Sequence, residues 1–321
     1  MKVHAIQTGE VQIKSRHQRA RFEDRLARFL DVLTDPDWSP RLPIGAWLIE
    51  HPDGLILVDT GESSHANDPG YQPWWHPFAR YCERRWVRPE EEIGPRVSAL
   101  NFDPGDVRWV IMTHMHGDHA GGLGHFPKSE ILLTEREARD ALAWTGPAFG
   151  FLNMHYPKWL KPKFIRFEDG PWESFEMSEA LTSDGRVRIV PTPGHTMGHQ
   201  SVVVDLGDHC VLIGGDASYN EAAMIRGEVD GVAQSAKLHH DSTRRMRQLC
   251  ERRPTVTQFA HNPDSKARLL AGAVAGSHAA IGQGMPIVAA HLPTFRIGAV
   301  AQSSRASDQL RSSPSAVAFS P

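Results

Sequence analysis

The segment HMHGDH at residues 114–119 constrains this chain more than any other stretch, because it places four metal-binding side chains within six residues. It follows the apolar run WVIM at residues 109–112, with only Thr113 between them. That run predicts a buried strand, so His114 and His116, two residues apart, leave the strand end on the same side. A glycine then allows a sharp turn that brings the last two residues of the segment back towards the same point.

These donors are imidazoles and one carboxylate, with no thiolate. Such a set suits zinc and also accepts iron or manganese, whereas a structural zinc site would more usually contain cysteines. The alternative is a polar loop that carries its histidines by chance. A close pair is unremarkable in a chain with 18 histidines among 321 residues, but HxHxDH at a strand end is a more specific pattern.

Three more predicted strands end in a candidate ligand. The strand at residues 187–190 runs into a rigid Pro-Thr-Pro-Gly turn and His195, a strand at 210–213 runs into Gly-Gly-Asp216, and residues 255–260 end at His261. Strands that deliver His or Asp at their carboxyl ends are expected where one edge of a layered sheet collects a metal site. The seven candidates exceed what one tetrahedral ion can use, so we predict two ions bridged by a carboxylate and a water. The candidates are His114, His116, Asp118, His119, His195, Asp216 and His261.

The remaining pattern predicts an alternation of strands and helices. Apolar runs predict strands at residues 3–8, 44–49, 55–58, 131–133 and 201–205, and the run at 55–58 ends at Asp59, either a turn residue or a partner of a ligand histidine. Helical spacing predicts a helix within 22–33, and a capping box of Thr134 and Glu137 predicts another to about residue 144. Two aromatic stretches, 62–96 and 145–170, either cover the edge of the core or line an apolar pocket, and for 62–96 we expect core cover.

Composition excludes several classes of protein. The net charge of −3 and the pI of about 6.7 give no basic face for nucleic acid or an anionic membrane. Three scattered cysteines suggest neither disulfides nor a thiolate site, which fits a reducing compartment and a cytoplasmic protein. No window approaches the ~20 apolar residues that a membrane helix needs.

Taken together, HxHxDH, Gly194-His195, Asp216 and His261 resemble the metallo-β-lactamase superfamily over roughly residues 1–270. The resemblance implies an α/β fold of the four-layer αββα sandwich type. It also implies one ion held by the first two motif histidines and His195, a second held by the Asp and last His of the motif and His261, and Asp216 as the bridge. Asp59 matches the superfamily's aspartate that supports a ligand histidine.

Longer motifs point to one branch of the superfamily. HMHGDHAGG at residues 114–122, GHQS at 198–201 and DASY at 216–219 resemble N-acyl homoserine lactonases, the quorum-quenching lactonases. The resemblance implies a hydrolase with two zinc ions per chain, or iron or manganese instead, that opens the lactone ring through a metal-bridging hydroxide. It implies that Tyr219 stabilises the oxyanion, while Asp118 or a bound water protonates the ring alkoxide. Without the motif, Tyr219 would be assigned to the packed core.

Two other enzyme classes on this fold remain open, a thioester hydrolase of the glyoxalase II type and a non-haem iron sulfur dioxygenase. The expected partner is a small acyl lactone, and the oligomeric state is open, a homodimer included. We expect His199, four residues after His195, to support the ligand loop, and the adjacent His239 and His240 to point apart on a helix. Residues 271–321, rich in Ala, Gly and Ser, are expected to be a flexible low-complexity tail.

Overall fold

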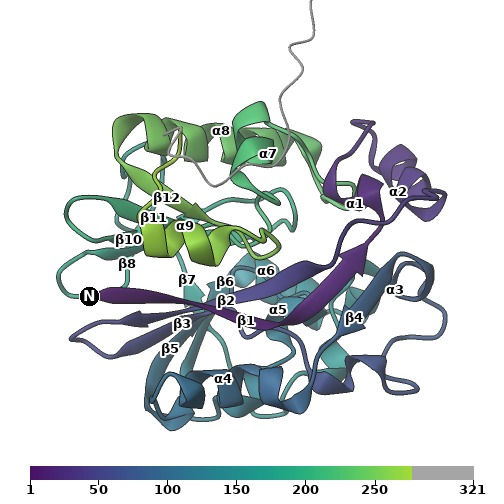
Figure 1. Ribbon diagram of the computed structural model, residues 1–321, viewed down its shortest axis with the longest axis horizontal. Coiled ribbons are helices and arrows are strands. Elements are labelled where there is room, and N and C mark those ends of the chain that lie inside the picture. Colours follow the sequence, from purple (N-terminus) through teal and green to yellow (C-terminus); the bar gives the residue numbers. More distant parts are fainter. Residues whose placement is uncertain (277–321) are drawn as a thin grey trace, which may run out of the picture. The chain divides into compact units, whose positions relative to one another are not determined.

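The computed structural model describes residues 1–276, which form two β-sheets with helices on their outer faces (Figure 1). The larger sheet has the strand order β4-β1-β2-β3-β5-β6-β7 and the smaller sheet the order β12-β11-β10-β9-β8. The strands of the larger sheet are β1 (Lys2–Ile13), β2 (Leu42–Glu50), β3 (Leu55–Val58), β4 (Glu83–Trp86), β5 (Val107–Ile111), β6 (Glu130–Thr134) and β7 (Lys163–Ile165). Those of the smaller sheet are β8 (Glu179–Ala180), β9 (Val187–Pro191), β10 (Gln200–Asp205), β11 (Cys210–Ile213) and β12 (Thr255–Gln258).

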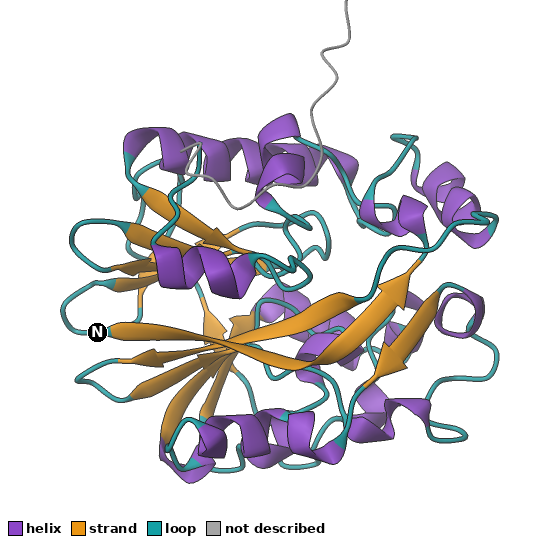
Figure 2. Cartoon of the chain, in the orientation of Figure 1, coloured by secondary structure: helices purple, strands orange, loops and turns teal. Residues whose placement is uncertain are grey.

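Helices connect the strands and pack on the outside of the two sheets (Figure 2). The α-helices are α1 (Ser15–Gln18), α2 (Arg25–Leu33), α3 (Pro77–Tyr81), α4 (Ile93–Ala99), α5 (Gly117–Ala120), α6 (Glu135–Leu142), α7 (Glu221–Arg226), α8 (Ala236–Arg252) and α9 (Ser265–Ala271). Short 3-10 helices include η4 (Leu123–His125) and η5 (Gly146–Phe149). None of the helices within residues 1–276 is long and apolar enough to cross a membrane.

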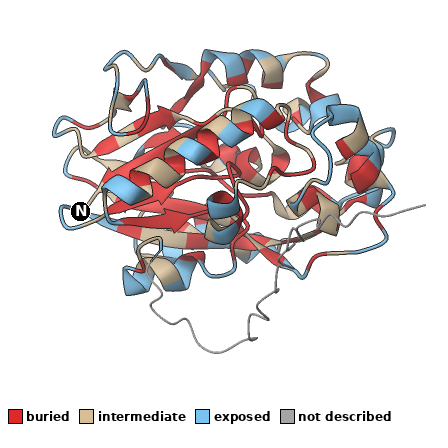
Figure 3. Ribbon diagram, turned by 90° about the horizontal axis from the view of Figure 1, so that it is seen from above, coloured by how far each residue is buried: buried red, intermediate tan, exposed pale blue. Residues whose placement is uncertain are grey.

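Alternation along the strands divides the core into layers. On β2 and β3, Trp47, Ile49 and Ile56 face the smaller sheet and pack against its residues, whereas Leu48 and Leu57 face the opposite way. The side-chain period of two in a strand therefore gives each central strand two buried faces. Figure 3 shows this burial, with strands that are mostly red and helices in which red, tan and pale blue residues alternate.

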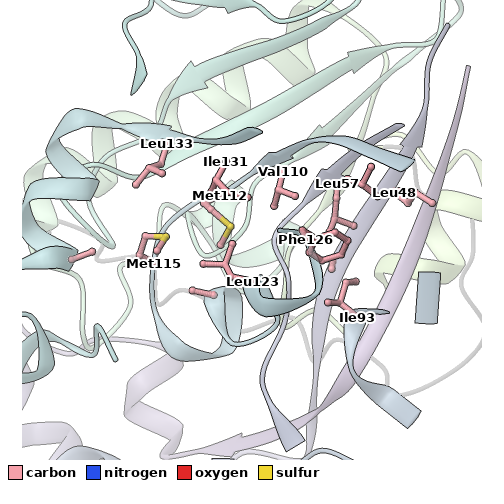
Figure 4. Packing of buried hydrophobic residues seen from close by; sticks show 14 of the residues in the cluster. Leu48, Leu57, Ile93, Val110, Met112, Met115, Leu123, Phe126, Ile131 and Leu133 are labelled. Carbon is pink, nitrogen blue, oxygen red and sulfur yellow. The ribbon is translucent and has the colours of Figure 1, made fainter. Parts of the chain in front are cut away.

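The two outer layers are helical. Leu57 and Val110 of the larger sheet pack against Ile93 of α4, Leu123 of η4 and Phe126, which follows η4 (Figure 4). On the far side, the smaller sheet's outward residues pack against α7 and α8. The order helices, sheet, sheet, helices is the four-layer αββα sandwich, so the predicted fold class is confirmed.

The element boundaries differ from the predicted ones in a few places. The first strand is longer than residues 3–8, because a bulge near Gly9, whose φ is 116°, lets it continue to Ile13. Helix α2 begins at Arg25, and α6 ends at Leu142. The predicted domain end at 270 falls inside α9, and the chain remains attached beyond it, because the Ala275 amide donates to the Thr255 carbonyl over 2.7 Å. The rest of the predicted tail, 277–321, lies outside the described residues.

We expect Leu57→Ala to lower the free energy of unfolding by about 3 kcal/mol, because Leu57 is fully buried between β3 and α4 and its loss leaves a cavity. Leu26→Ala is the matched control, since Leu26 on α2 is 65% exposed and should change stability by less than about 0.5 kcal/mol. Urea denaturation of both variants at equal metal content measures the difference. Equal stability of the two variants would contradict the layer assignment.

Candidate metal centre

The seven predicted ligands converge at one edge of the sandwich, where strands end. His114, His116, Asp118 and His119 follow β5 and enter α5, which begins at Gly117. The other three lie just beyond the smaller sheet's strands β9, β11 and β12. The three triads that could hold a metal are His114 with His116 and His195, His114 with His119 and Asp216, and Asp118 with His119 and His261.

The first triad has the spacing of a metal site. The Nδ1 atom of His116 lies 3.1 Å from Nε2 of His114 and 3.1 Å from Nε2 of His195. Nitrogen ligands 2.0–2.1 Å from a tetrahedral zinc ion are separated by about 3.3 Å. Three imidazole nitrogens at this spacing cannot all be satisfied by one another, because each contact needs a proton on one side and a lone pair on the other.

The second group surrounds the carboxylate of Asp216. Its Oδ2 atom lies 3.4 Å from Nε2 of His261 and 3.6 Å from Nε2 of His195, and its Oδ1 atom lies 3.4 Å from Nε2 of His119. Asp118 approaches the same group, with Oδ2 3.3 Å from Nε2 of His261. Asp216 therefore touches residues of both outer triads, the position that a bridging carboxylate needs.

Unsatisfied buried atoms test whether this donor set fits metal ions. Nε2 of His119 and Oδ1 of Asp216 are sealed from solvent. The two atoms lie 3.4 Å apart without forming a hydrogen bond, and neither has another hydrogen-bond partner among the described residues. Leaving a buried polar atom unpaired costs about 1–3 kcal/mol, so such atoms normally indicate a missing partner. Both atoms face the cluster centre, and their chemistry is that of zinc, iron or manganese ligands. The residues fit a dinuclear metal site.

The pKa values of the cluster histidines agree with a metal site. Burial and then the neighbouring imidazole of His195 lower the pKa of His116 to about 3, and burial lowers that of His114 far below its usual range, so both present lone pairs. Burial also opposes charging of His261, but the carboxylates of Asp216 and Asp118 outweigh it and raise that pKa to about 10. A cation bound at the centre would offset the negative charge of these two carboxylates, as the proton on His261 does without it.

A hydrogen bond at the other ring nitrogen fixes each histidine of the cluster. Nδ1 of His119 lies 2.8 Å from Asp59 and Nδ1 of His195 lies 3.1 Å from Asp230. The remaining contacts are His114 Nδ1 to Thr113 Oγ1 at 3.1 Å, His116 Nε2 to the Phe149 carbonyl at 2.9 Å and His261 Nδ1 to the Pro43 carbonyl at 2.9 Å. Such partners fix the tautomer and the ring orientation of a metal-binding histidine. Asp59 thus occupies the place that its motif implied.

Asp230 is the residue of the site that the sequence did not indicate. It lies in the loop between α7 and α8, is buried, and contacts both His195 and Nε2 of His239. Burial opposes its charge, but these two imidazoles hold its pKa well below the usual range. No motif marked Asp230, because it acts across 35 positions of sequence through a loop without periodicity.

The three other histidines lie as the sequence predicted. His199 is buried beside the cluster, and its Nδ1 lies 2.9 Å from the Thr192 hydroxyl in the turn that leads to His195. On α8, His239 points inwards to Asp230 while His240 lies on the surface beside Glu23. None of these three belongs to a metal-compatible group among residues 1–276.

A cavity of about 140 Å³ opens onto the cluster. Its lining includes the cluster residues His116, Asp118, His195, Asp216 and His261 together with Tyr219. The Tyr219 ring stacks on His261 with centroids 5.7 Å apart, so the phenol stands beside the cluster and not in a core remote from it. Burial, and then the carboxylate of Asp216, raise the Tyr219 pKa far above its usual value, which keeps the hydroxyl a proton donor.

The two aromatic stretches contribute to the cavity wall. Phe78 of α3 and Phe149 of η5 line it, and the Arg25 guanidinium of α2 lies 5.0 Å from the centre of the Phe149 ring at its rim. The expectation that residues 62–96 mainly cover the core was wrong, because Trp74 is 84% exposed and Phe78 faces the cavity. Hydrophobic composition alone does not distinguish a pocket wall from a core edge.

Comparison with known proteins assigns the family. A family model described as the metallo-β-lactamase superfamily matches residues 40–256, more than half of the chain and nearly all of the cluster's elements. The chain belongs to the metallo-β-lactamase superfamily. His261 lies just outside the matched range, and its position in the cluster comes from the structure.

Relatives within the superfamily include hydrolases and lactonases. A probable metallo-hydrolase of Mycobacterium tuberculosis is 36% identical over 190 residues, which are 57% of this chain and only 58% of that protein's length. An N-acyl homoserine lactonase of Rhizobium johnstonii is 29% identical over 228 residues, covering 69% of this chain and 82% of that enzyme. The solved structure of an N-acyl homoserine lactone hydrolase with N-hexanoyl-L-homoserine at its catalytic metal centre has a TM-score of 0.65 and 22% identity, covering 83% and 95% of the two chains. This structural likeness supports the fold.

We expect Asp230→Asn to weaken metal binding by about 10- to 100-fold, because the amide keeps the shape of the carboxylate but loses the charge that orients and polarises His195. Asp184→Asn is the control, since Asp184 makes a similar contact with His51 away from the cluster. Competition with a chelator measures both affinities. Equal affinities would show that His195 is not held through Asp230 for metal binding.

Proposed function

We propose that this protein is a metal-dependent hydrolase that opens the lactone ring of N-acyl homoserine lactones. The observation that carries the proposal is Tyr219, which stands in the cavity wall against His261 and three residues after Asp216. The similarity to the Rhizobium johnstonii lactonase supports the same substrate class. The cavity has metal-binding groups at one end and Phe78 and Phe149 further out. It therefore fits a substrate that carries a polar ring and an apolar chain.

Two ions are the proposed cofactors, with zinc as the first candidate. His114, His116 and His195 would hold one ion, Asp118, His119 and His261 the other, and Asp216 would contact both. When bound, two such ions lower the pKa of a water and polarise a carbonyl oxygen, which supplies a nucleophile and a Lewis acid.

The residues of the chain supply the rest of the chemistry. The Tyr219 hydroxyl makes no hydrogen bond to the described residues, so it is available to donate one to the lactone carbonyl oxygen. That bond strengthens as the oxygen gains negative charge, and therefore stabilises the transition state more than the bound substrate.

Asp118 is the proposed proton carrier. Burial disfavours its charge, but His119 and His261 outweigh burial and lower the Asp118 pKa, so the carboxylate is ionised and can accept a proton. It lines the cavity and remains partly exposed, with 19% of its side chain accessible. In ring opening the carboxylate accepts the proton released on attack and passes it to the leaving alkoxide, which becomes the product alcohol.

We expect Tyr219→Phe to lower kcat for an N-acyl homoserine lactone by about 10- to 100-fold, because the ring and its packing remain while one oxyanion donor is lost. Metal content and melting temperature should stay at wild-type values. Tyr81→Phe is the matched control, since Tyr81 is exposed on α3, and it should keep wild-type kcat. A Tyr219→Phe variant with wild-type kcat and both ions bound would reduce Tyr219 to a packing residue.

A substrate panel tests the proposed activity itself. Zinc-, iron- and manganese-loaded protein is assayed with N-acyl homoserine lactones, thioesters and persulfides, with oxygen consumption followed for the last. We expect the lactones to give the highest kcat/KM, without oxygen consumption. Preferred turnover of thioesters, or oxygen-dependent turnover of persulfides by the iron form, would replace the proposal with a thioesterase or a sulfur dioxygenase.

A further inference from the structure

A row of aromatic rings runs along one wall of the cavity from the metal cluster to the surface. His261 stacks on Tyr219 at 5.7 Å between centroids, Tyr219 meets His17 edge-on at 6.2 Å, and His17 meets Phe78 edge-on at 5.5 Å. Phe29 of α2 stacks on Phe78 at 5.5 Å and ends the row. The first four rings are buried, and Phe29 is partly exposed at the opening.

The row changes in polarity along its length. Its inner part consists of His261, a residue of the cluster, and Tyr219 beside it. Its outer part, Phe78 and Phe29, is wholly apolar. His17 lies between the two parts and is the polar ring farthest from the cluster in the row. Along this row of rings, a molecule would meet the metal-binding groups first, then the His17 imidazole, and then two hydrocarbon rings.

The two nitrogens of the His17 ring lack a hydrogen-bond partner among residues 1–276. Neither ring nitrogen forms a hydrogen bond with the described residues, although the residue is only 6% exposed. Nδ1 is sealed from solvent, which leaves Nε2 as the nitrogen able to reach a molecule in the cavity. An unpaired imidazole in such a place costs stability, so a role in packing alone would be served better by phenylalanine.

The backbone holds His17 firmly against the cavity. Its carbonyl accepts a 2.8 Å hydrogen bond from the amide of Gly231, one residue after Asp230. A Cβ atom on Gly231 would lie 2.3 Å from the Arg16 carbonyl oxygen, so the close approach of α1 to this loop requires glycine. The backbone at His17 is therefore fixed relative to the loop that also positions His195.

We propose that His17 binds a second polar group of the substrate, an amide placed between the reacting lactone and the apolar chain. A neutral imidazole offers one donor and one acceptor, and a secondary amide presents one of each in return. In an N-acyl homoserine lactone the amide joins the lactone ring to the acyl chain, which is the order of groups along the wall. This inference rests on the proposed lactonase function and adds that His17 selects acyl homoserine lactones over lactones with plain alkyl chains.

Three variants and two substrates test the role of His17. The substrates are N-octanoyl homoserine lactone and an α-alkyl-γ-butyrolactone of equal length, in which carbon atoms replace the amide. His17→Phe keeps a ring against Tyr219 and Phe78 but removes both nitrogens, and His17→Gln places an amide near the former Nε2. His240→Phe, on the surface of α8, is the control.

We expect His17→Phe to lower kcat/KM for the acyl homoserine lactone by about tenfold, mainly through KM, and to leave the alkyl lactone within twofold of wild type. His17→Gln should restore most of the loss, the control should match wild type, and the melting temperature of His17→Phe should not fall.

Equal losses on both substrates, or no loss on either, would overturn the role assigned to His17. A melting temperature that falls together with both activities would instead give His17 a structural role and also overturn the proposal. If the wild-type protein hydrolyses the alkyl lactone but not the acyl one, the substrate class fails while the lactonase chemistry stands. If it hydrolyses neither, the proposed function fails, and the role of His17 falls with it.

Discussion

The candidate metal centre depends on hydrogen bonds at the ring nitrogens that face away from the cluster. The bond between Asp59 and His119, at 2.8 Å, is the shortest of them. Asp59 has a positive φ of 58°, which non-glycine residues seldom adopt, at the end of β3. Its carboxylate accepts from the amide of Thr113 at 2.7 Å, from the Thr113 hydroxyl at 2.8 Å and from His119. These three bonds retain the unfavourable backbone angle, and they fix the loop after β5 relative to β3.

The two sheets then set the distance between the two halves of the centre. The backbone amide of Gln200, at the start of β10, donates to the carbonyl of Thr113 at 3.0 Å, and its side chain donates to the carbonyl of Met112 at 3.0 Å. Trp47 of β2 likewise donates to the side chain of Gln258 on β12. These contacts join the two sheets, and so fix the spacing between the ligands that follow β5 and the ligands His195 and His261 of the smaller sheet.

Local patterns in the sequence predicted the parts of the structure that depend on neighbours in the chain. The core strands follow from apolar runs, and the seven cluster residues follow from HxHxDH and from His or Asp at strand ends. Asp230 could not be predicted, because its partner His195 is distant in sequence and only the fold brings them together. The place of Phe78 in the cavity wall was hidden for a similar reason, since composition does not tell which side of an aromatic segment faces a cavity.

We proposed that seven side chains from two sheets form one site for two ions that share Asp216. Anomalous diffraction from crystals of the zinc-loaded protein, recorded on both sides of the zinc absorption edge, tests it most directly. We expect two peaks, one among His114, His116 and His195 and one among Asp118, His119 and His261, each in contact with Asp216. A single peak at full zinc occupancy, or two peaks of which one lies away from Asp216, would contradict it.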